Sequence, residues 1–150
     1  MDHVAEFLGK IHPIVLHFPL ALLVIGAAAE CVRLFRDSPF LARAVTWLFA
    51  LGAVTAILSA GSGWLLAAHE HIRSDQKSTL ESHRWLGVAT AVVSSLAWVA
   101  AARDSLPPPR RSVRRILALA AGLLVMATGY FGGELVWGRD WFQPREQSSP

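Results

Sequence analysis

Residues 12–32 form the first long apolar stretch of the chain and read HPIVLHFPLALLVIGAAAECV. Within this stretch, residues 14–32 are almost free of charge. They approach the ~20 residues that a helix needs to cross ~30 Å of hydrocarbon. Three further stretches have the same character, at residues 44–68, 85–102 and 116–136. The sequence therefore predicts four transmembrane helices.

The composition also indicates a membrane protein. Of the 150 residues, 53% are hydrophobic and only 17% are charged, whereas a soluble domain typically has ~25% charged residues. The mean hydropathy is +0.41. Four spans use most of the chain and leave no room for a separate soluble domain. We therefore expect one all-α domain, residues 1–150, folded as a polytopic up-and-down bundle of four transmembrane helices in the lipid bilayer.

The basic residues predict the orientation of this bundle. The connections at residues 32–43 and 103–115 hold eight arginines, against six basic residues on the other side over a greater length. Because cytoplasmic loops carry the excess of Lys and Arg, we expect both termini and the loop 69–83 on the extracytoplasmic side of a bacterial inner membrane. The net charge of +3 has the same explanation and does not indicate nucleic-acid binding. Residues 1–10 lack the pattern of a secretory signal, so the first span is expected to stay in the mature protein.

All the histidines lie toward the predicted extracytoplasmic ends of the apolar stretches. Imidazole is costly to place in or near hydrocarbon, and ionisable residues at membrane depth are by default candidates for ligands, relays or paired groups. The sequence therefore directs attention to this end of the bundle. Its histidines are His3, His12, His17, His69, His71 and His83.

Two prolines disturb the start of the first span. Pro13 suits the first turn of a helix, where a missing N–H is harmless. Pro19 removes the hydrogen bond to the Val15 carbonyl if the helix begins near Pro13, and it should then bend the chain beside His17. Alternatively, residues 12–17 form an irregular lead-in that is covered by protein or lines a wet cavity. Both versions predict that His17 faces the protein.

The histidines at the starts of the first and third spans are candidate haem ligands, because two imidazoles from different helices can hold one haem iron. We expect His17 and His83 to be the axial pair of a haem b, with His12 as the first substitute. Gly87 lies one turn beyond His83 and would leave room for the porphyrin. Two arginines near the same surface are expected to pair with the propionates, namely Arg84 and Arg139.

Other interpretations of the same residues stay open. His17 could bond a backbone carbonyl freed by Pro19, and His83 could be an interfacial anchor. A zinc or copper ion is a further alternative, because imidazole and carboxylate suit both metals. The sequence has no His-Glu-x-x-His motif, and no Ser–His–acid spacing indicates a nucleophilic enzyme. These observations do not decide whether the protein is an enzyme, and that question stays open. The candidate ligands of such an ion are His12, His17, His83 and Glu134.

Small residues recur on the second and fourth spans. Gly52, Ala56 and Ala60 are four positions apart, and Gly122 and Gly129 are seven apart. Such stripes allow helix backbones to approach closely in lipid. The glycines are denser toward the histidine end, where a ligand would also need space. These small residues can therefore be interpreted either as sites of tight helix packing or as space for a ligand.

Three motifs resemble the uncharacterised bacterial membrane family DUF2231. They are HPIVLHFPLAL at residues 12–22, HRWLG at 83–87 and GGELVWG at 132–138. The resemblance implies a four-helix integral membrane protein. Relatives in the family occur joined to or near cytochrome c and Rieske iron–sulfur domains, which implies a redox task at the extracytoplasmic face. This chain has no Cys-x-x-Cys-His motif, so any haem would be non-covalent and the redox partner a separate polypeptide.

Two functions from different classes follow from these observations. The first is a haem b electron-transfer protein that connects quinol with an extracytoplasmic cytochrome c or Rieske-type protein. The second is a non-catalytic membrane anchor or accessory subunit of a larger redox complex. A histidine-based metal-binding membrane protein is the third possibility.

Overall fold

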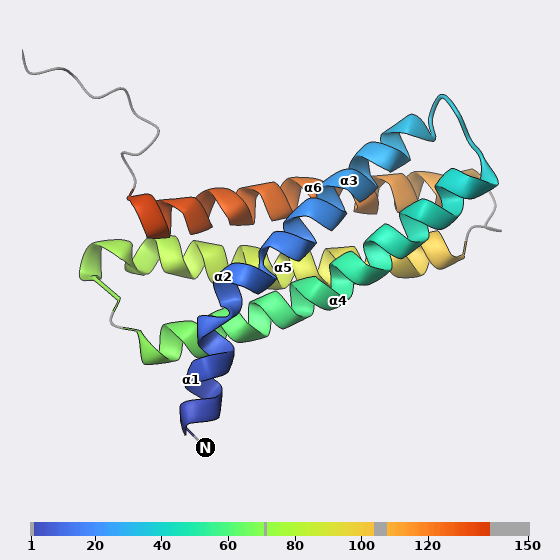
Figure 1. The fold of residues 1–150 in the computed structure, drawn as a ribbon. Coiled ribbons are helices and arrows are strands. Elements are labelled where there is room, and N and C mark those ends of the chain that lie inside the picture. Colours follow the sequence, from blue (N-terminus) through green and yellow to red (C-terminus); the bar gives the residue numbers. More distant parts are fainter. Residues whose placement is uncertain (1, 71, 104–107, 139–150) are drawn as a thin grey trace, which may run out of the picture.

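The computed structural model describes residues 2–70, 72–103 and 108–138, and the elements in that part of the chain are helices. In this part of the chain, two short helices precede four long ones (Figure 1). A single 3-10 turn, η1, leads into the third long helix. The elements are α1 (Asp2–Lys10), α2 (His12–Val15), α3 (His17–Val32), α4 (Pro39–His69), η1 (Ser74–Gln76), α5 (Lys77–Ala102) and α6 (Pro108–Trp137).

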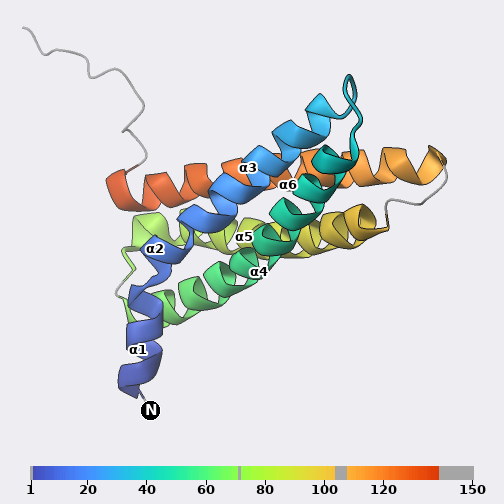
Figure 2. The same ribbon diagram turned by 45° about the vertical axis from the view of Figure 1, so that its right-hand side comes forward.

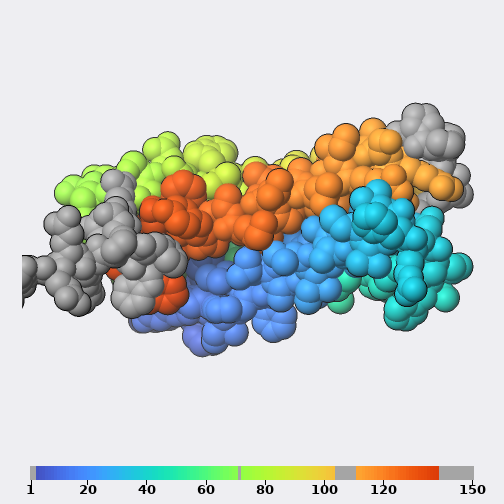
Figure 3. Space-filling model, turned by 90° about the horizontal axis from the view of Figure 1, so that it is seen from above, coloured from blue at the N-terminus to red at the C-terminus, as the bar shows by residue number. Residues whose placement is uncertain are grey.

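The four long helices pack as a bundle in which neighbours along the chain run in opposite directions (Figure 1). Helix α3 packs against α4 and α6, and α5 packs against the same two helices. Seen from above, α3 and α6 lie side by side along the bundle (Figure 3). The predicted all-α bundle of four helices is therefore confirmed.

The long helices have the length and composition of membrane spans. Four candidate spans are His3–Val32, Pro39–His69, Ser74–Ala102 and Arg111–Trp137. Many large apolar side chains on the outside are exposed, as expected where lipid rather than water surrounds the protein. The helices extend beyond the charge-free stretches. Helix α4, for example, begins at residue 39 because Pro39 occupies its first turn and the Ser38 hydroxyl accepts a hydrogen bond from Leu41 N at 3.2 Å.

The interior of the bundle differs between its two halves. A cluster of fully buried apolar side chains, including Leu23, Val45 and Phe49, fills the half that contains the end of α3 and the starts of α4 and α6. Helices approach closely beside this cluster, since a Cβ added at Gly52 would lie 2.5 Å from Leu23 Cδ2. In the other half the interior carries hydroxyl groups and imidazoles. Its buried hydroxyl residues are Ser59, Ser62, Thr79 and Thr90.

The entrance to the first span is irregular, as the prolines predict. The helix is interrupted at Ile11 and again at Leu16, and α3 begins only at His17. Pro19 lies in the first turn of α3 and has no N–H to offer to the preceding turn. Figure 2 shows α1 turned away from the direction of α3, and it packs on α4.

The expected position of His17 is wrong. Its side chain is exposed rather than facing the protein. Nδ1 of His17 lies 2.6 Å from the carbonyl oxygen of Pro13 in its own segment. Leu16 keeps a helical backbone conformation, and five positions on a helix correspond to a turn of about 140°, so His12 and His17 do not share a face. The alternative expectation was a hydrogen bond from His17 to a carbonyl freed by Pro19, and the acceptor is instead the Pro13 carbonyl.

Candidate functional site: a pair of histidines between helices

The imidazoles of His12 and His83 meet in the polar half of the bundle. His12 comes from α2 and His83 from α5, and the two ring centroids are 6.2 Å apart. The rings are nearly perpendicular, with an interplanar angle of 83°. Both side chains are half-buried. The fold thus brings together two imidazoles that are 71 positions apart in the sequence.

One nitrogen of His12 is fixed by α4. Nδ1 lies 3.0 Å from the carbonyl oxygen of Ser59 and 3.2 Å from the Ser62 hydroxyl. Because a carbonyl oxygen can only accept, Nδ1 carries the proton and donates it. In the neutral ring, Nε2 then keeps a lone pair that is free to accept a hydrogen bond or bind a metal.

The second imidazole is held in the same way by α6. Nδ1 of His83 lies 2.9 Å from the carbonyl oxygen of Thr128, so it also donates, and Nε2 again has the lone pair. The Thr128 hydroxyl contacts that of Thr90 at 3.2 Å, which ties α5 to α6 just beyond the ring. Both histidines therefore present the same nitrogen for further chemistry.

Each imidazole rests against a glycine of the helix that it bonds. A Cβ added at Gly63 would lie 2.9 Å from Cε1 of His12, and one added at Gly132 would lie 3.1 Å from Cε1 of His83. Contacts this short show that any larger residue would displace the rings. The dense glycines at this end therefore create the space for the two imidazoles, while glycines such as Gly52 serve helix packing.

A cation lies beside the pair. The guanidinium of Arg84, next to His83 in sequence, stacks 4.5 Å from the ring centroid of Trp64. Trp64 in turn packs edge-on against Trp85, with 6.4 Å between centroids. The Nε atom of Arg84 is buried and has no hydrogen-bond acceptor among the described residues.

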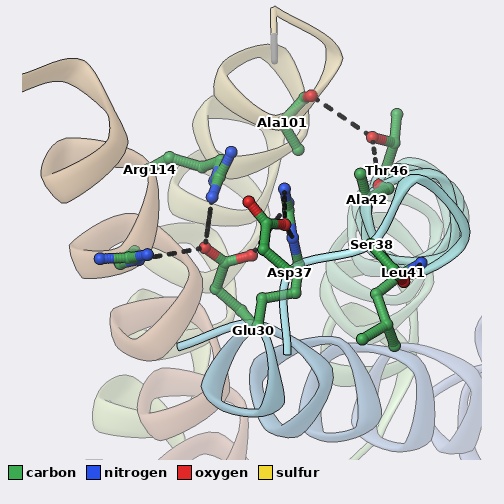
Figure 4. Close-up of polar contacts among 10 residues, drawn as sticks. Glu30, Asp37, Ser38, Leu41, Ala42, Thr46, Ala101 and Arg114 are labelled. Atoms are coloured by element: carbon green, nitrogen blue, oxygen red, sulfur yellow. Dashed lines mark hydrogen bonds and ion pairs between the residues drawn. The ribbon is translucent and has the colours of Figure 1, made fainter. Parts of the chain in front are cut away.

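A second polar cluster lies at the opposite end of the bundle (Figure 4). Glu30 of α3 is 1% exposed, and its Oε1 accepts hydrogen bonds from Arg114 Nε at 3.0 Å and Nη2 at 2.9 Å. Its Oε2 lies 3.4 Å from Arg33 Nη1. Arg33 also bonds Asp37, and this hydrogen bond holds the pKa of the Asp37 carboxyl below its usual value.

Comparison with known families identifies the chain. The model of the family described as "Predicted membrane protein (DUF2231)" matches residues 9–140. The chain belongs to the DUF2231 family. No curated protein and no solved structure matches it. Both polar clusters of this DUF2231 protein lie within the matched residues.

The DUF2231 chain does not bring together all the metal ligands that the sequence predicts. No group of three or more His, Cys, Asp or Glu side chains that could hold a metal ion occurs among the described residues. His17 is exposed and bonds Pro13, while Glu134 accepts a hydrogen bond from Tyr130 on its own helix. The four proposed metal ligands therefore do not come together among the described residues, because His17 is exposed on the other side of its helix from His12 and Glu134 has a local partner.

The other candidate residues of the sequence analysis lie outside the contact between His12 and His83. Gly87 has open space beside it, since the only neighbour of an added Cβ is Thr128 Cγ2 at 3.9 Å. His3 and His69 are exposed, and His69 Nδ1 bonds the Leu65 carbonyl at 2.8 Å. Arg139 and His71 lie outside the described residues of the DUF2231 protein.

Several residues of both clusters were not expected from the sequence. The hydrogen bonds from the two imidazoles are accepted by the backbone carbonyls of Ser59 and Thr128, which leave no signal in the sequence. Arg33 and Arg114 were assigned to loops, but both side chains are buried in the bundle end. Glu30 did have a signal, because it is the one acid within residues 14–32, and an acid inside an apolar span calls for a partner.

Proposed function

We propose that this DUF2231 protein transfers electrons through a haem b held between His12 and His83. The observation that carries the proposal is the meeting of these two imidazoles, from separate helices, in the half-buried polar end of the bundle. His12, the first substitute predicted from the sequence, replaces His17 because its ring is the one that lies against His83.

The spacing of the rings supports one metal centre between them. The two rings are close neighbours, so one group bound between the helices could contact both His12 and His83. The observed separation is 6.2 Å. Both Nε2 atoms keep their lone pairs because both Nδ1 atoms donate to carbonyls, an arrangement typical of metal-ligating histidines.

The number of ligands favours haem over a simple ion. Zinc sites use three or four protein ligands, and among the described residues no such group exists. The porphyrin supplies four nitrogens itself, so a haem iron needs only two axial side chains. Two imidazoles without a third ligand therefore fit a haem better than zinc or copper.

The protein would set the properties of this centre through its own residues. The Nδ1 hydrogen bonds orient both rings and increase the basicity of Nε2. Gly63 and Gly132 leave room for the rings, and Gly87 adds open space on α5. Arg84, whose buried Nε has no acceptor among the residues that the structure describes, is suited to pair with a propionate. A bound haem would supply one-electron redox chemistry at this end of the bundle.

The location of the pair suggests the direction of electron transfer. The arginine-rich connections lie at the opposite end, and the positive-inside rule puts them in the cytoplasm. The histidine end, with both termini, then faces the extracytoplasmic side of a bacterial inner membrane. Quinol from the bilayer is the proposed donor, and a cytochrome c or Rieske-type protein is the proposed acceptor.

An absorption spectrum of the full chain, purified in detergent from cells supplied with a haem precursor, tests this function. We expect a Soret band that shifts and sharpens on dithionite reduction, with separate α and β bands. His12→Ala and His83→Ala should each remove this low-spin spectrum, whereas His17→Ala should retain it. A full spectrum in both single variants would refute the assignment.

An accessory membrane subunit is the second candidate. The specific observation in its favour is that His12 and His83 already tie helices together, since one bonds α4 and the other α6. In that case both variants would be destabilised, no visible spectrum would form, and the protein would co-purify with a larger complex. Elemental analysis separates the third possibility, because stoichiometric zinc or copper without porphyrin would indicate a metal-binding protein.

A further inference from the structure

The arginine end of the bundle holds more positive than negative charge. The arginine cluster consists of Arg33, Arg111, Arg114 and Arg115, with the carboxylates of Glu30 and Asp37. The buried members are Arg33, Arg114 and Glu30, at 4%, 4% and 1% exposure. Within the described part of the chain, four guanidinium groups therefore face two carboxylates.

Oε1 of Glu30 is occupied by hydrogen bonds from Arg114, so it does not also accept one from Arg115. Oε1 of Glu30 already accepts two hydrogen bonds from Arg114, and Arg115 Nε lies 3.8 Å away from the same oxygen. This distance is too long for a hydrogen bond. The Nε atom of Arg115 is buried with no acceptor among the described residues, although 36% of its side chain is exposed. Arg115 thus combines an unsatisfied buried donor with access to the surface.

The position of these arginines on α6 raises the local positive potential further. Helix α6 begins at Pro108, so Arg111, Arg114 and Arg115 lie in its first two turns. The amino-terminal end of a helix carries partial positive charge, where cations are unfavourable and anions are stabilised. The charge-free apolar stretch at residues 116–136 begins directly after Arg115. These arginines therefore lie at the depth where a span meets the lipid headgroups.

We propose that the arginine cluster binds the phosphate of an anionic phospholipid, with Arg115 as the principal ligand. A guanidinium can donate two parallel hydrogen bonds to phosphate oxygens, which would also supply an acceptor for Arg115 that the described residues do not provide. Glu30 is a positioning residue, because it holds Arg114 and Arg33 inside the cluster. Basic sites between transmembrane helices are suited to anionic headgroups. Free phosphate shares this chemistry, but the location at a span end favours lipid.

The test uses the full chain in detergent micelles and follows the thermal unfolding midpoint by tryptophan fluorescence. Phosphatidylglycerol, phosphatidylcholine and inorganic phosphate are titrated separately. We expect phosphatidylglycerol to raise the midpoint with saturation, and phosphatidylcholine to have no such effect. Arg115→Gln should raise the half-saturating lipid concentration at least about tenfold, the loss expected for hydrogen bonds to a charged group. Arg103→Gln, an exposed arginine at the end of α5, is the matched control and should leave it unchanged.

A second variant keeps the result interpretable if Arg115→Gln does not fold. Arg115→Lys retains the charge but loses the planar pair of donors, and we expect intermediate lipid affinity. Equal losses in Arg115→Gln and Arg103→Gln would show non-specific attraction and overturn the site. The proposal would also be overturned if phosphatidylcholine stabilised the chain equally well. Full stabilisation by inorganic phosphate, with nothing added by lipid, would overturn the lipid assignment.

Discussion

Glu30 of α3 and Arg114 of α6 are 84 positions apart in sequence, yet two hydrogen bonds of 3.0 and 2.9 Å join their side chains. Both residues are almost completely buried. This pair links the first and last long helices at the arginine end of the bundle. Its effect on stability can be measured directly.

Replacing Glu30 should strongly destabilise the bundle. Glu30→Gln would leave Arg114 and Arg33 buried without their carboxylate, and breaking a buried pair in this way costs ~3–5 kcal/mol. Thermal unfolding of the detergent-purified protein measures the loss. The matched control is Glu6→Gln, because Glu6 pairs with Lys10 at 2.7 Å on an exposed surface. Such exposed pairs contribute little to stability because water and salt screen them. Similar losses for both variants would contradict the role given to Glu30.

Asp37 should make stability depend on pH only under acidic conditions. Its hydrogen bond from Arg33 lowers the carboxyl pKa from the ordinary value of 3.8. The stabilisation is therefore fully present above that value and is lost as the pH falls through the lower pKa of the folded protein. We expect the midpoint difference between the wild type and Asp37→Asn to be constant from neutral pH to about pH 5 and to shrink below pH 4. A difference that vanished near pH 6 would rule out this carboxylate as its source.

The glycine beneath His12 should be sensitive to a single added methyl group. Gly63→Ala would place a Cβ 2.9 Å from the imidazole, so the ring must move. Overpacking of this kind costs about 1–3 kcal/mol. We also expect lower haem occupancy, measured as the ratio of Soret to protein absorbance. Gly61→Ala, two positions away on α4, is the control, because nothing lies within 4 Å of its added Cβ. Equal behaviour of the two variants would show that contact with His12 does not matter.

Arg84 should contribute to haem affinity without being an iron ligand. If its buried Nε pairs with a propionate, Arg84→Gln should retain the low-spin spectrum but weaken haem binding about tenfold. Haem titration of the apoprotein gives this ratio. Arg73→Gln is the control, since Arg73 is exposed and paired with Asp75 at 3.0 Å. An unchanged affinity in Arg84→Gln would assign the arginine to stacking on Trp64 alone.

The sequence predicted the bundle well because the signal for spans is local. Each charge-free stretch is long enough to cross a membrane by itself, and its position needs no knowledge of the partners. The histidine pair was predictable only in part. His12 and His83 were both candidates, but Pro19 interrupts the hydrogen-bond pattern beside His17, so the sequence alone did not decide which of His12 and His17 points inward.

The Glu30 cluster shows the limit of spacing arguments. The contact between Glu30 and Arg33 follows from their separation by three positions on adjoining turns. The contact with Arg114 depends on how α3 packs against α6, and no pattern within either segment contains that information. The same is true of the backbone carbonyls of Ser59 and Thr128, because every residue has such an acceptor.

The two halves of the bundle interior are unequal, because only the half with the histidines is polar. Leu23, Val45 and Phe49 leave no exposed surface and separate the histidine pair from the arginine cluster. A proton or small ion that entered from the histidine end would meet hydroxyl groups first. Beyond His12 it would meet only the apolar cluster, where a charge is costly to bury. It would therefore have to leave by the side from which it came, so chemistry at the histidines would communicate with one aqueous compartment only.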